Sequence, residues 1–266
     1  TAPAVFKRLN AKVIEMYFEL DGTFPNHEAN PIEPSNLIDL QKAVKKHKAD
    51  IGLAFDGDAD RCFLVDEKGD LVNPSALTAL IATRELKKYP GSNIIYNLIS
   101  SRAVKEVVEE NGGSAVRSRV GHSYIKKLMA ETNAVFGGEH SGHFYFRDFW
   151  KADSGMLAAL HAIAALGETQ SSLSQLLKTF NRYYSSGEIN STVADAPAAM
   201  DAIEKIYGGK DGVEVDHLDG LTINGDSWWF NLRASNTEPL LRLNVEASTE
   251  ARMSKVRDDV LNTIRG

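Results

Sequence analysis

The chain has 266 residues, of which 43% are hydrophobic and 25% charged, and its formal net charge at pH 7 is −6. This composition is typical of a soluble globular protein, and the length predicts more than one domain. The acidic balance argues against a nucleic-acid partner, and the short apolar runs argue against a membrane-spanning helix. The sequence starts without a secretory signal and contains one cysteine, Cys62, so we expect a cytoplasmic protein.

The first third of the chain is expected to begin inside a domain. Its predicted elements are the end of a helix at 3–10, a strand at 12–18, a helix from about 37, a buried strand at 51–55 and a hairpin of 62–65 with 69–72. An acidic stretch at 56–61 therefore directly follows the carboxyl end of a strand. Open α/β sheets bind their ligands at this position.

Strands and helices alternate in the middle of the chain. We expect helices at 77–89, 101–111, 122–131, 153–166 and 173–183, and strands at 93–99, 115–120 and 134–136. This alternation predicts a parallel or mixed sheet with helices on its faces. From about residue 186, strands at 188–193, 221–223, 228–230 and 240–245, with helices at 198–207 and 250–264, predict a smaller α+β domain.

The acidic stretch, here called the Asp loop (residues 56–61), places carboxylates at every second position. Asp56, Asp58 and Asp60 alternate with a glycine and an alanine, and Arg61 follows. Alternate side chains of an extended or curved loop point the same way, so three like charges converge and need a counter-charge. A hard divalent cation suits three carboxylates, although a solvated acidic turn is the simpler alternative.

A calcium-binding helix–loop–helix is a second alternative for this stretch. Asp56, Asp58, Asp60 and Glu67 match four of the five pattern positions that we compared. The position that needs glycine holds Arg61, however, and the predicted flanking elements are strands. The calcium-loop interpretation therefore fails on its surroundings.

A second loop, the Glu loop (residues 137–143), follows the predicted strand at 134–136. It combines Glu139, Ser141, His140 and His143 with three glycines. Glutamate and serine together can exchange hydrogen bonds with sugar hydroxyls, and a histidine can move a proton near neutral pH. As a zinc site the loop is poor, because no further cysteine lies nearby, and His140 by itself is read as incidental.

Two further stretches could hold an anion. The Arg loop (residues 233–239) offers Arg233, Ser235, Asn236 and Thr237 between two predicted strands, and these groups suit phosphate oxygens. Glu238 does not suit an anion site and is expected to brace an arginine such as Arg242. Judged alone, the stretch is better explained as a polar hairpin loop. His122 and Lys126 belong to a helix whose N-terminus could also hold an anion, which by itself is a weak indication.

These three loops, in this order and each after a strand, resemble those of the α-D-phosphohexomutases, specifically the bacterial phosphomannomutase/phosphoglucomutase group. The resemblance covers essentially the whole chain. It implies an α/β fold with mixed αβα sandwich domains and a smaller α+β C-terminal domain. It divides the chain at residues 1–73 (part of domain 2), 74–186 (domain 3) and 187–266 (domain 4), with domain 1 of the same protein missing.

The resemblance also implies roles for the loop residues. Asp56, Asp58 and Asp60 resemble the family's Mg²⁺ ligands, and Arg61 would stand near the phosphate. Glu139 and Ser141 resemble its sugar-binding residues, with His143 as a candidate for proton transfer and substrate contact. Arg233, Ser235, Asn236 and Thr237 resemble its phosphate-binding loop, and His122 and Lys126 are further expected substrate contacts.

The implied reaction moves a phosphoryl group between the 1- and 6-hydroxyls of mannose or glucose through a phosphoserine and a hexose 1,6-bisphosphate. The chain departs from the family pattern in three respects. No Ser-His-Asn sequence, the context of the nucleophile, occurs in the 266 residues. Ala59 replaces a common glycine, which we expect to be a mild change, and no lysine stands near residues 97–99.

Two other functions remain open at this point. The chain could bind magnesium and sugar phosphate without turnover, because the serine is not in it. An amino-sugar phosphate mutase would share the fold and the Asp loop, although the Glu and Arg loops favour a hexose.

Overall fold

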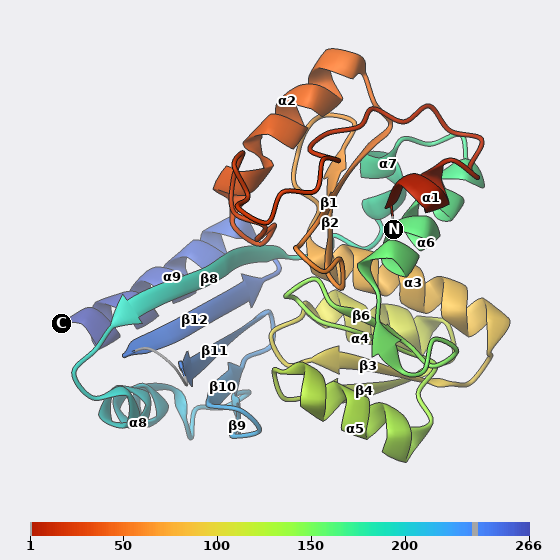
Figure 1. The fold of residues 1–266 in the computed structure, drawn as a ribbon. Coiled ribbons are helices and arrows are strands. Elements are labelled where there is room, and N and C mark those ends of the chain that lie inside the picture. The colour runs from red at the N-terminus through yellow and green to blue at the C-terminus, as the bar shows by residue number, and fades with distance from the viewer. Residues whose placement is uncertain (1, 236–238) are drawn as a thin grey trace.

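The apolar run of residues 51–55 forms a strand that brings the Asp loop to the end of a small sheet. The computed structural model describes residues 2–235 and 239–266. In it, strand β1 (Ile51–Phe55) pairs antiparallel with β2 (Cys62–Asp66), with Phe55 opposite Cys62. The helical segments before this pair are α1 (Ala2–Phe6), the 3-10 turn η1 (Pro34–Leu37) and α2 (Ile38–His47). The Asp loop is therefore the connection between two paired strands (Figure 1).

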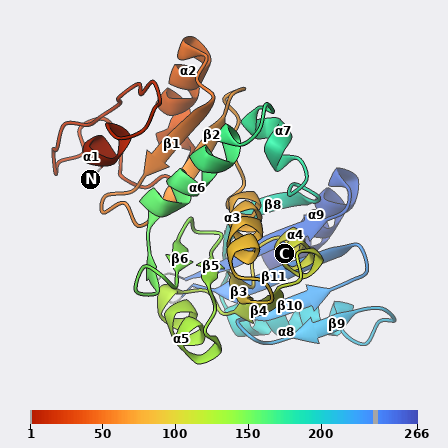
Figure 2. The same cartoon turned by 90° about the vertical axis from the view of Figure 1, so that its right-hand side faces the viewer.

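The second sheet is mixed, and helices cover both of its faces (Figures 1 and 2). Its order is β4-β3-β5-β6-β7, in which β3 pairs parallel with β4 and β5, whereas β6 and β7 are antiparallel. The strands are β3 (Asn93–Asn97), β4 (Ser114–Ser118), β5 (Phe136–Gly138), β6 (Phe144–Phe146) and β7 (Ala152–Asp153). The helices are α3 (Pro74–Lys88), α4 (Arg102–Glu110), α5 (His122–Thr132), α6 (Gly155–Gly167) and α7 (Leu173–Leu177).

Alternation along strand β3 explains this layering. Ile94 packs into a core with residues of α3, α4 and α6, whereas its neighbour Ile95 packs with Ile125 and Met129 of α5. Successive side chains of a strand point to opposite faces, so one apolar strand supplies both cores. The result is a helix–sheet–helix sandwich.

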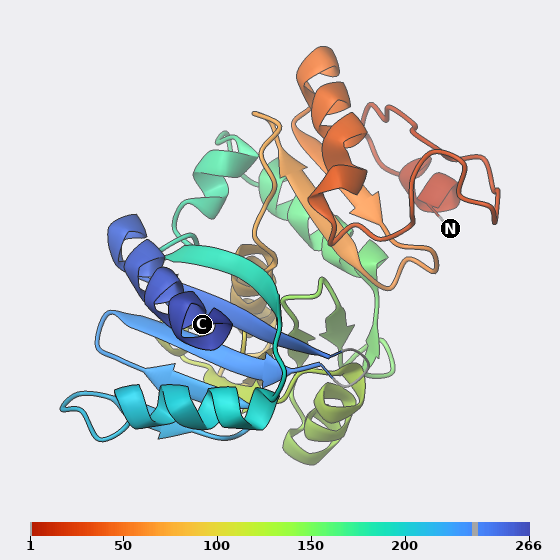
Figure 3. The same cartoon turned by 90° about the vertical axis from the view of Figure 1, so that its left-hand side faces the viewer.

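The third sheet is antiparallel and has helices on one face only (Figure 3). Its order is β8-β12-β11-β10-β9, and helices α8 (Ala196–Tyr207) and α9 (Glu250–Arg265) pack on it through Ile203, Met253, Val256 and Val260. The strands are β8 (Tyr184–Thr192), β9 (Glu214–Asp216), β10 (Leu221–Asn224), β11 (Trp228–Ala234) and β12 (Leu240–Ala247). The predicted α/β class, with a smaller α+β part at the C-terminal end, is confirmed.

Several sequence predictions of single elements are wrong. The helix expected at 3–10 ends at Phe6, and the strand expected at 69–72 is only an isolated bridge between Leu71 and Val65. Residues 12–18 form no strand, and among the described residues they pair with none of the three sheets. The helix predicted for 173–183 ends at Leu177, and Arg182 beyond it binds Glu106 and Glu110 of α4 instead. Within residues 2–235 and 239–266, no helix combines the length and apolar character needed to cross a membrane.

Helix α6 begins against the Asp loop, and Gly155 makes this close approach possible. Its N–H donates to the carbonyl oxygen of Ala59 at 3.1 Å. A Cβ atom at Gly155 would lie 2.3 Å from the carbonyl oxygen of Arg61, which is closer than atoms can pack. The contact at Gly155 therefore sets how closely the start of α6 approaches the Asp loop.

We predict that Gly155→Ala destabilises the protein by about 1–3 kcal/mol, because the methyl group forces backbone apart in a well-packed contact. Urea unfolding would measure the change. Gly167→Ala is the matched control in the same helix, since a Cβ there meets nothing within 4 Å. Equal stability of the two variants would contradict the close approach.

Candidate active site

The three carboxylates of the Asp loop converge as their spacing predicts. Oxygen atoms of Asp56, Asp58 and Asp60 lie within 4.8 Å of one another. The N–H of Ala59 donates to the Asp56 carbonyl at 3.2 Å, which closes a tight turn. Ala59 adopts this turn with φ at +62°, a left-handed conformation that favours glycine. Replacing the common glycine by alanine is therefore a strained change.

Arg61 folds back onto the loop that precedes it. Its backbone N–H and its Nε donate to the two carboxylate oxygens of Asp56 at 3.1 and 2.7 Å, and Nη1 donates to Asn30 at 3.2 Å. Burial by itself would raise the pKa of Asp56, but the hydrogen bonds and charge of Arg61 more than offset it and lower the pKa. Arg61 thus keeps one of the three carboxylates ionised.

The loop fits a hard divalent cation. The Oδ1 atom of Asp60 is buried and has no hydrogen-bond partner among the described residues. Burial, together with the charges of Asp56, Asp58 and Asp153, raises the pKa of Asp60 to about 6. An oxygen-preferring cation such as Mg²⁺ would supply both the missing partner and the missing counter-charge.

The Glu loop lies directly beside the Asp loop, and backbone groups join them. It connects strands β5 and β6 and is closed by hydrogen bonds from Glu139 N–H to His143 O and from Gly142 N–H to Glu139 O, at 3.0 and 3.1 Å. The N–H of Cys62 donates to Gly142 O at 3.0 Å, and Arg61 and His143 form an antiparallel bridge. Two loops about 80 residues apart in sequence therefore form one site.

Glu139 is the most enclosed of the predicted site residues. Its side chain is only 3% exposed. One carboxylate oxygen accepts from Tyr145 OH at 3.0 Å and from Ser141 Oγ at 3.4 Å, and the other accepts from Gly121 N–H at 3.1 Å. The carboxylate is thus held in a fixed position, with the long contact to Ser141 as the weakest of the three bonds.

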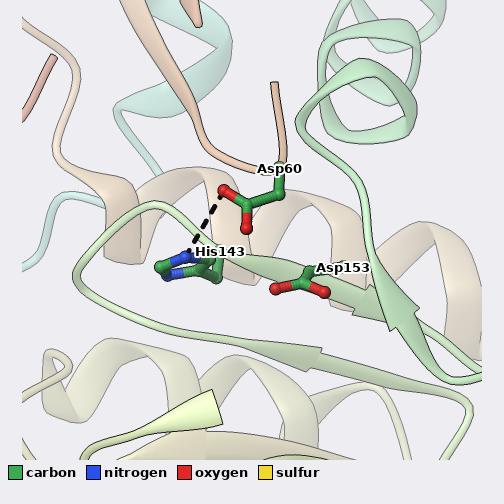
Figure 4. Close-up of side chains that lie close together, drawn as sticks. All are labelled: Asp60, His143 and Asp153. Atoms are coloured by element: carbon green, nitrogen blue, oxygen red, sulfur yellow. Dashed lines mark ion pairs between the residues drawn. The ribbon is translucent and has the colours of Figure 1, made fainter. Parts of the chain in front are cut away.

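His143 stands between the two loops. Its Nδ1 lies 2.9 Å from Ser141 Oγ. Its Nε2 lies 3.5 Å from Asp60 Oδ1, and Figure 4 marks this ion pair with a dashed line. Burial lowers the pKa of His143 although Glu139 and Asp153 work in the opposite direction. A neutral imidazole at this position can accept a proton at neutral pH.

Asp153 completes this cluster and was missed in the sequence. One of its oxygens lies within 4.8 Å of ligand atoms of Asp60 and His143 (Figure 4). Its Oδ1 pairs with Lys126 Nζ at 3.0 Å. The sequence shows Asp153 only as the start of a predicted helix, and its position depends on how β7 pairs with β6.

The two predicted residues of α5 have different surroundings. Lys126 reaches the cluster through Asp153, and its ammonium lies 5.8 Å from the centre of the Tyr145 ring. His122 is exposed at the first position of the helix. Gly121, which caps this helix, offers no side chain to its first turn.

Arg233 of the Arg loop and Arg242 of the following strand β12 lie at the same carboxylate. Arg233 Nη2 and Arg242 Nη1 lie 3.8 and 3.3 Å from the two oxygens of Glu188 on β8, and Arg242 Nη2 donates to Ser235 Oγ at 3.4 Å. Guanidinium groups such as these two bind phosphate oxygens through charge-assisted hydrogen bonds. Glu188 was not singled out in the sequence, because only the pairing of β8 with β12 brings it here.

Three predicted or discussed positions of this loop, Asn236, Thr237 and Glu238, lie outside the described residues. The sheet that carries the loop nevertheless lies close to the Glu loop. The charge of Glu188 acts on the buried His140, whose pKa burial lowers overall.

Family models match almost the entire chain. They are described as phosphoglucomutase/phosphomannomutase alpha/beta/alpha domain II at residues 1–69, alpha/beta/alpha domain III at 73–183 and the C-terminal domain at 188–263.

Individual proteins give the same result. A phosphomannomutase of Methanocaldococcus jannaschii is 44% identical over 244 residues, which is 92% of this chain and 54% of that protein. A phosphoglucomutase/phosphomannomutase family structure from Burkholderia thailandensis superimposes with a TM-score of 0.89 at 32% identity, covering 99% of this chain and 57% of the other. The chain spans about half the length of the curated relatives it matches.

More distant structures share the fold alone. An N-acetylphosphoglucosamine mutase of Aspergillus fumigatus in complex with GlcNAc-6P and magnesium matches with a TM-score of 0.59 at 15% identity, covering 85% of this chain and 52% of that one.

We predict that Ala59→Gly stabilises the protein by about 1–2 kcal/mol, because glycine adopts the left-handed conformation without the steric penalty of a Cβ atom. The free energy of unfolding in urea would measure the gain. Ala54→Gly on strand β1 is the control and should destabilise by about 0.5–1 kcal/mol. A loss of stability at position 59 would contradict the strained turn.

Proposed function

The chain belongs to the phosphoglucomutase/phosphomannomutase family, and we propose that it is the C-terminal part of a phosphohexomutase. The enzyme would interconvert the 1-phosphate and 6-phosphate of mannose or glucose through a phosphoserine and a hexose 1,6-bisphosphate. The serine would come from domain 1 of the same protein. In this proposal residues 1–73 are part of domain 2, residues 74–186 are domain 3 and residues 187–266 are domain 4.

One observation carries the proposal: backbone hydrogen bonds hold three convergent carboxylates beside Glu139, Ser141 and His143. A phosphoryl transfer to a sugar hydroxyl needs a cation for the phosphoryl group and polar groups for the sugar at the same place. Magnesium held by Asp56, Asp58 and Asp60 would neutralise charge on the transferring group. Arg61, fixed by Asp56 and Asn30, would contact the same phosphate.

Sugar hydroxyls would bind at Glu139 and Ser141. The Ser141–Glu139 contact of 3.4 Å is long, so a sugar hydroxyl can replace it at small cost. His143, neutral and adjacent to Ser141, would accept the proton of the reacting hydroxyl and return it in the reverse direction.

The Arg loop would bind the phosphate that does not react. Arg233 and Arg242 lie at the same carboxylate, and Ser235 accepts a hydrogen bond from Arg242, so two guanidinium groups and a hydroxyl are close together for phosphate oxygens. In the proposal Asn236 and Thr237 complete the contacts, and His122 and Lys126 add substrate contacts from α5. Because the bisphosphate must present either phosphate to this loop, the sugar has to reorient between the two transfers.

Binding of magnesium and sugar phosphate without turnover is a second candidate for the isolated chain. The observation in its favour is that no Ser-His-Asn occurs in the 266 residues. Calorimetric titration of the chain with glucose 1-phosphate and Mg²⁺, followed by ³¹P NMR of the mixture, separates the two. Product formed only when the serine-bearing part of the protein is present supports the mutase, and heat of binding without product in either case supports binding alone.

We predict that Asp58→Asn lowers turnover of the complete protein by about 100-fold or more, because the reaction loses electrostatic stabilisation of the phosphoryl group. The fold should not change, since Asp58 is exposed. Turnover of glucose 1-phosphate with Mg²⁺ measures the effect, and Asp201→Asn, at an exposed position of α8, is the control. Near-normal turnover of the Asp58 variant would remove the metal assignment.

We further predict that His143→Gln lowers kcat by about 100-fold with little change in KM, because glutamine can form a hydrogen bond with Ser141 but cannot take up the proton. Steady-state kinetics of the complete protein measure both constants. His217→Gln, in which the exposed partner of Glu204 is replaced, should leave both unchanged. If KM rises while kcat stays, His143 binds the sugar and does not move the proton.

A further inference from the structure

The second and third sheets meet along a seam of polar contacts that includes two arginines from the second sheet's unit. Arg102, at the start of α4, donates to the carbonyl oxygens of Gly225, Trp228 and Asp226 at 2.8, 3.1 and 3.2 Å. Arg117 on β4 pairs with Asp216 on β9 at 3.1 Å. These contacts join elements of the two sheets, but none of them involves a residue of the Asp or Glu loop.

Asp219 makes a different contact at the same seam. Its Oδ2 accepts the backbone N–H of Val120 at 3.1 Å, and its Oδ1 lies 3.7 Å from Arg119 Nη2. The side chain of Asp219 is 15% exposed. A carboxylate of the C-terminal sheet therefore binds the backbone of the segment that leads into α5.

The next amide in that segment binds Glu139. Gly121 N–H donates to Glu139 Oε1 at 3.1 Å. Gly121 has φ at +125° and ψ at 133°, a conformation accessible essentially only to glycine. Two successive amides thus bind two carboxylates, one from the C-terminal sheet and one from the Glu loop.

The position of Asp219 is itself fixed. Asn231, which is fully buried on β11, donates from Nδ2 to the Asp219 carbonyl oxygen and to Thr222 Oγ1, both at 3.0 Å. Asp216, the last residue of β9, accepts the N–H of Leu218 at 2.8 Å in the turn that leads to Asp219. These hydrogen bonds hold the turn that carries Asp219, so its carboxylate has a defined position from which it binds Val120.

We propose that Asp219 is a positioning residue for sugar binding: through Val120 and Gly121 it fixes the Glu139 carboxylate. The position of the C-terminal sheet thereby affects the position of the Glu loop. This inference rests on the proposed function for the identity of the sugar ligand only. The coupling itself follows from the hydrogen bonds at 3.1 Å that link Asp219, Val120, Gly121 and Glu139.

Asp219→Ala tests the coupling in the chain as it stands. Hydrogen exchange of the amides of Glu139 and Gly142 should accelerate about tenfold, since the loss of a hydrogen bond to a charged group frees the segment that holds Glu139. Titration with glucose 1-phosphate should show affinity weakened by about tenfold for the same reason. The affinity for Mg²⁺ alone should stay unchanged, because Asp219 makes no contact with the Asp loop.

Two further variants separate positioning from a general loosening of the seam. Asp219→Asn keeps an oxygen for the Val120 N–H and should restore both readouts, because the lost ion pair with the half-exposed Arg119 contributes little. Arg102→Ala breaks contacts to Gly225, Trp228 and Asp226 at the same seam but touches neither residues 119–121 nor the turn that carries Asp219, so it should leave the Glu loop amides unchanged.

The inference is overturned if Asp219→Ala alters exchange at Glu139 and Gly142 no more than Arg102→Ala does. It is also overturned if Asp219→Asn is as defective as Asp219→Ala, which would show that the ion pair and not the amide contact matters. If the unsubstituted chain does not bind glucose 1-phosphate, the proposed ligand is wrong, and the exchange measurements still decide the coupling.

Discussion

The hydrogen bond from Cys62 N–H to Gly142 O is the contact on which the candidate site depends. At 3.0 Å it joins the Asp loop to the Glu loop, and the bridge between Arg61 and His143 continues it. Backbone groups have little freedom once their strands are formed, so the separation of the two loops follows from the pairing of β1 with β2 and of β5 with β6. The side chains of the site are thus attached to backbone segments whose spacing is set by strand pairing.

This arrangement brings together charges that repel each other. Asp56, Asp58, Asp60 and Asp153 lie close together, and Arg61 and Lys126 are the basic side chains that pair with Asp56 and Asp153. The imbalance is visible at Asp60, whose pKa is raised to about 6 by burial and by the neighbouring carboxylates. At the other region, Arg233 and Arg242 bring two guanidinium groups to Glu188. The proposed reaction requires a cation for the transferring phosphoryl group and a binding site for a second phosphate, and these two regions offer ligands of both kinds.

The sequence predicts the parts of this site that depend on local spacing. The alternation of the aspartates brings their carboxylates together, and both the Asp loop and the Glu loop lie next to strands that their apolar residues predict. Asp153, Glu188 and Asp219 could not be predicted, because strand pairing and the packing of two sheets bring them to their partners. The strand expected at 12–18 was wrong since a strand needs a neighbour that the described chain does not supply there. The strain at Ala59 was underestimated because φ cannot be read from residue types alone.

The hydrogen bonds of Glu139 differ in a way that bears on how the proposed site would bind a sugar. Tyr145 and Gly121 hold the carboxylate from the protein side at 3.0 and 3.1 Å, whereas Ser141 contacts it at 3.4 Å and is itself 2.9 Å from His143. A sugar hydroxyl therefore has to replace only the weakest contact, and the carboxylate does not have to be ordered when the ligand arrives. Ordering a side chain on binding costs about 0.5–1.5 kcal/mol, so a carboxylate already held by Tyr145 and Gly121 avoids this cost when the ligand binds.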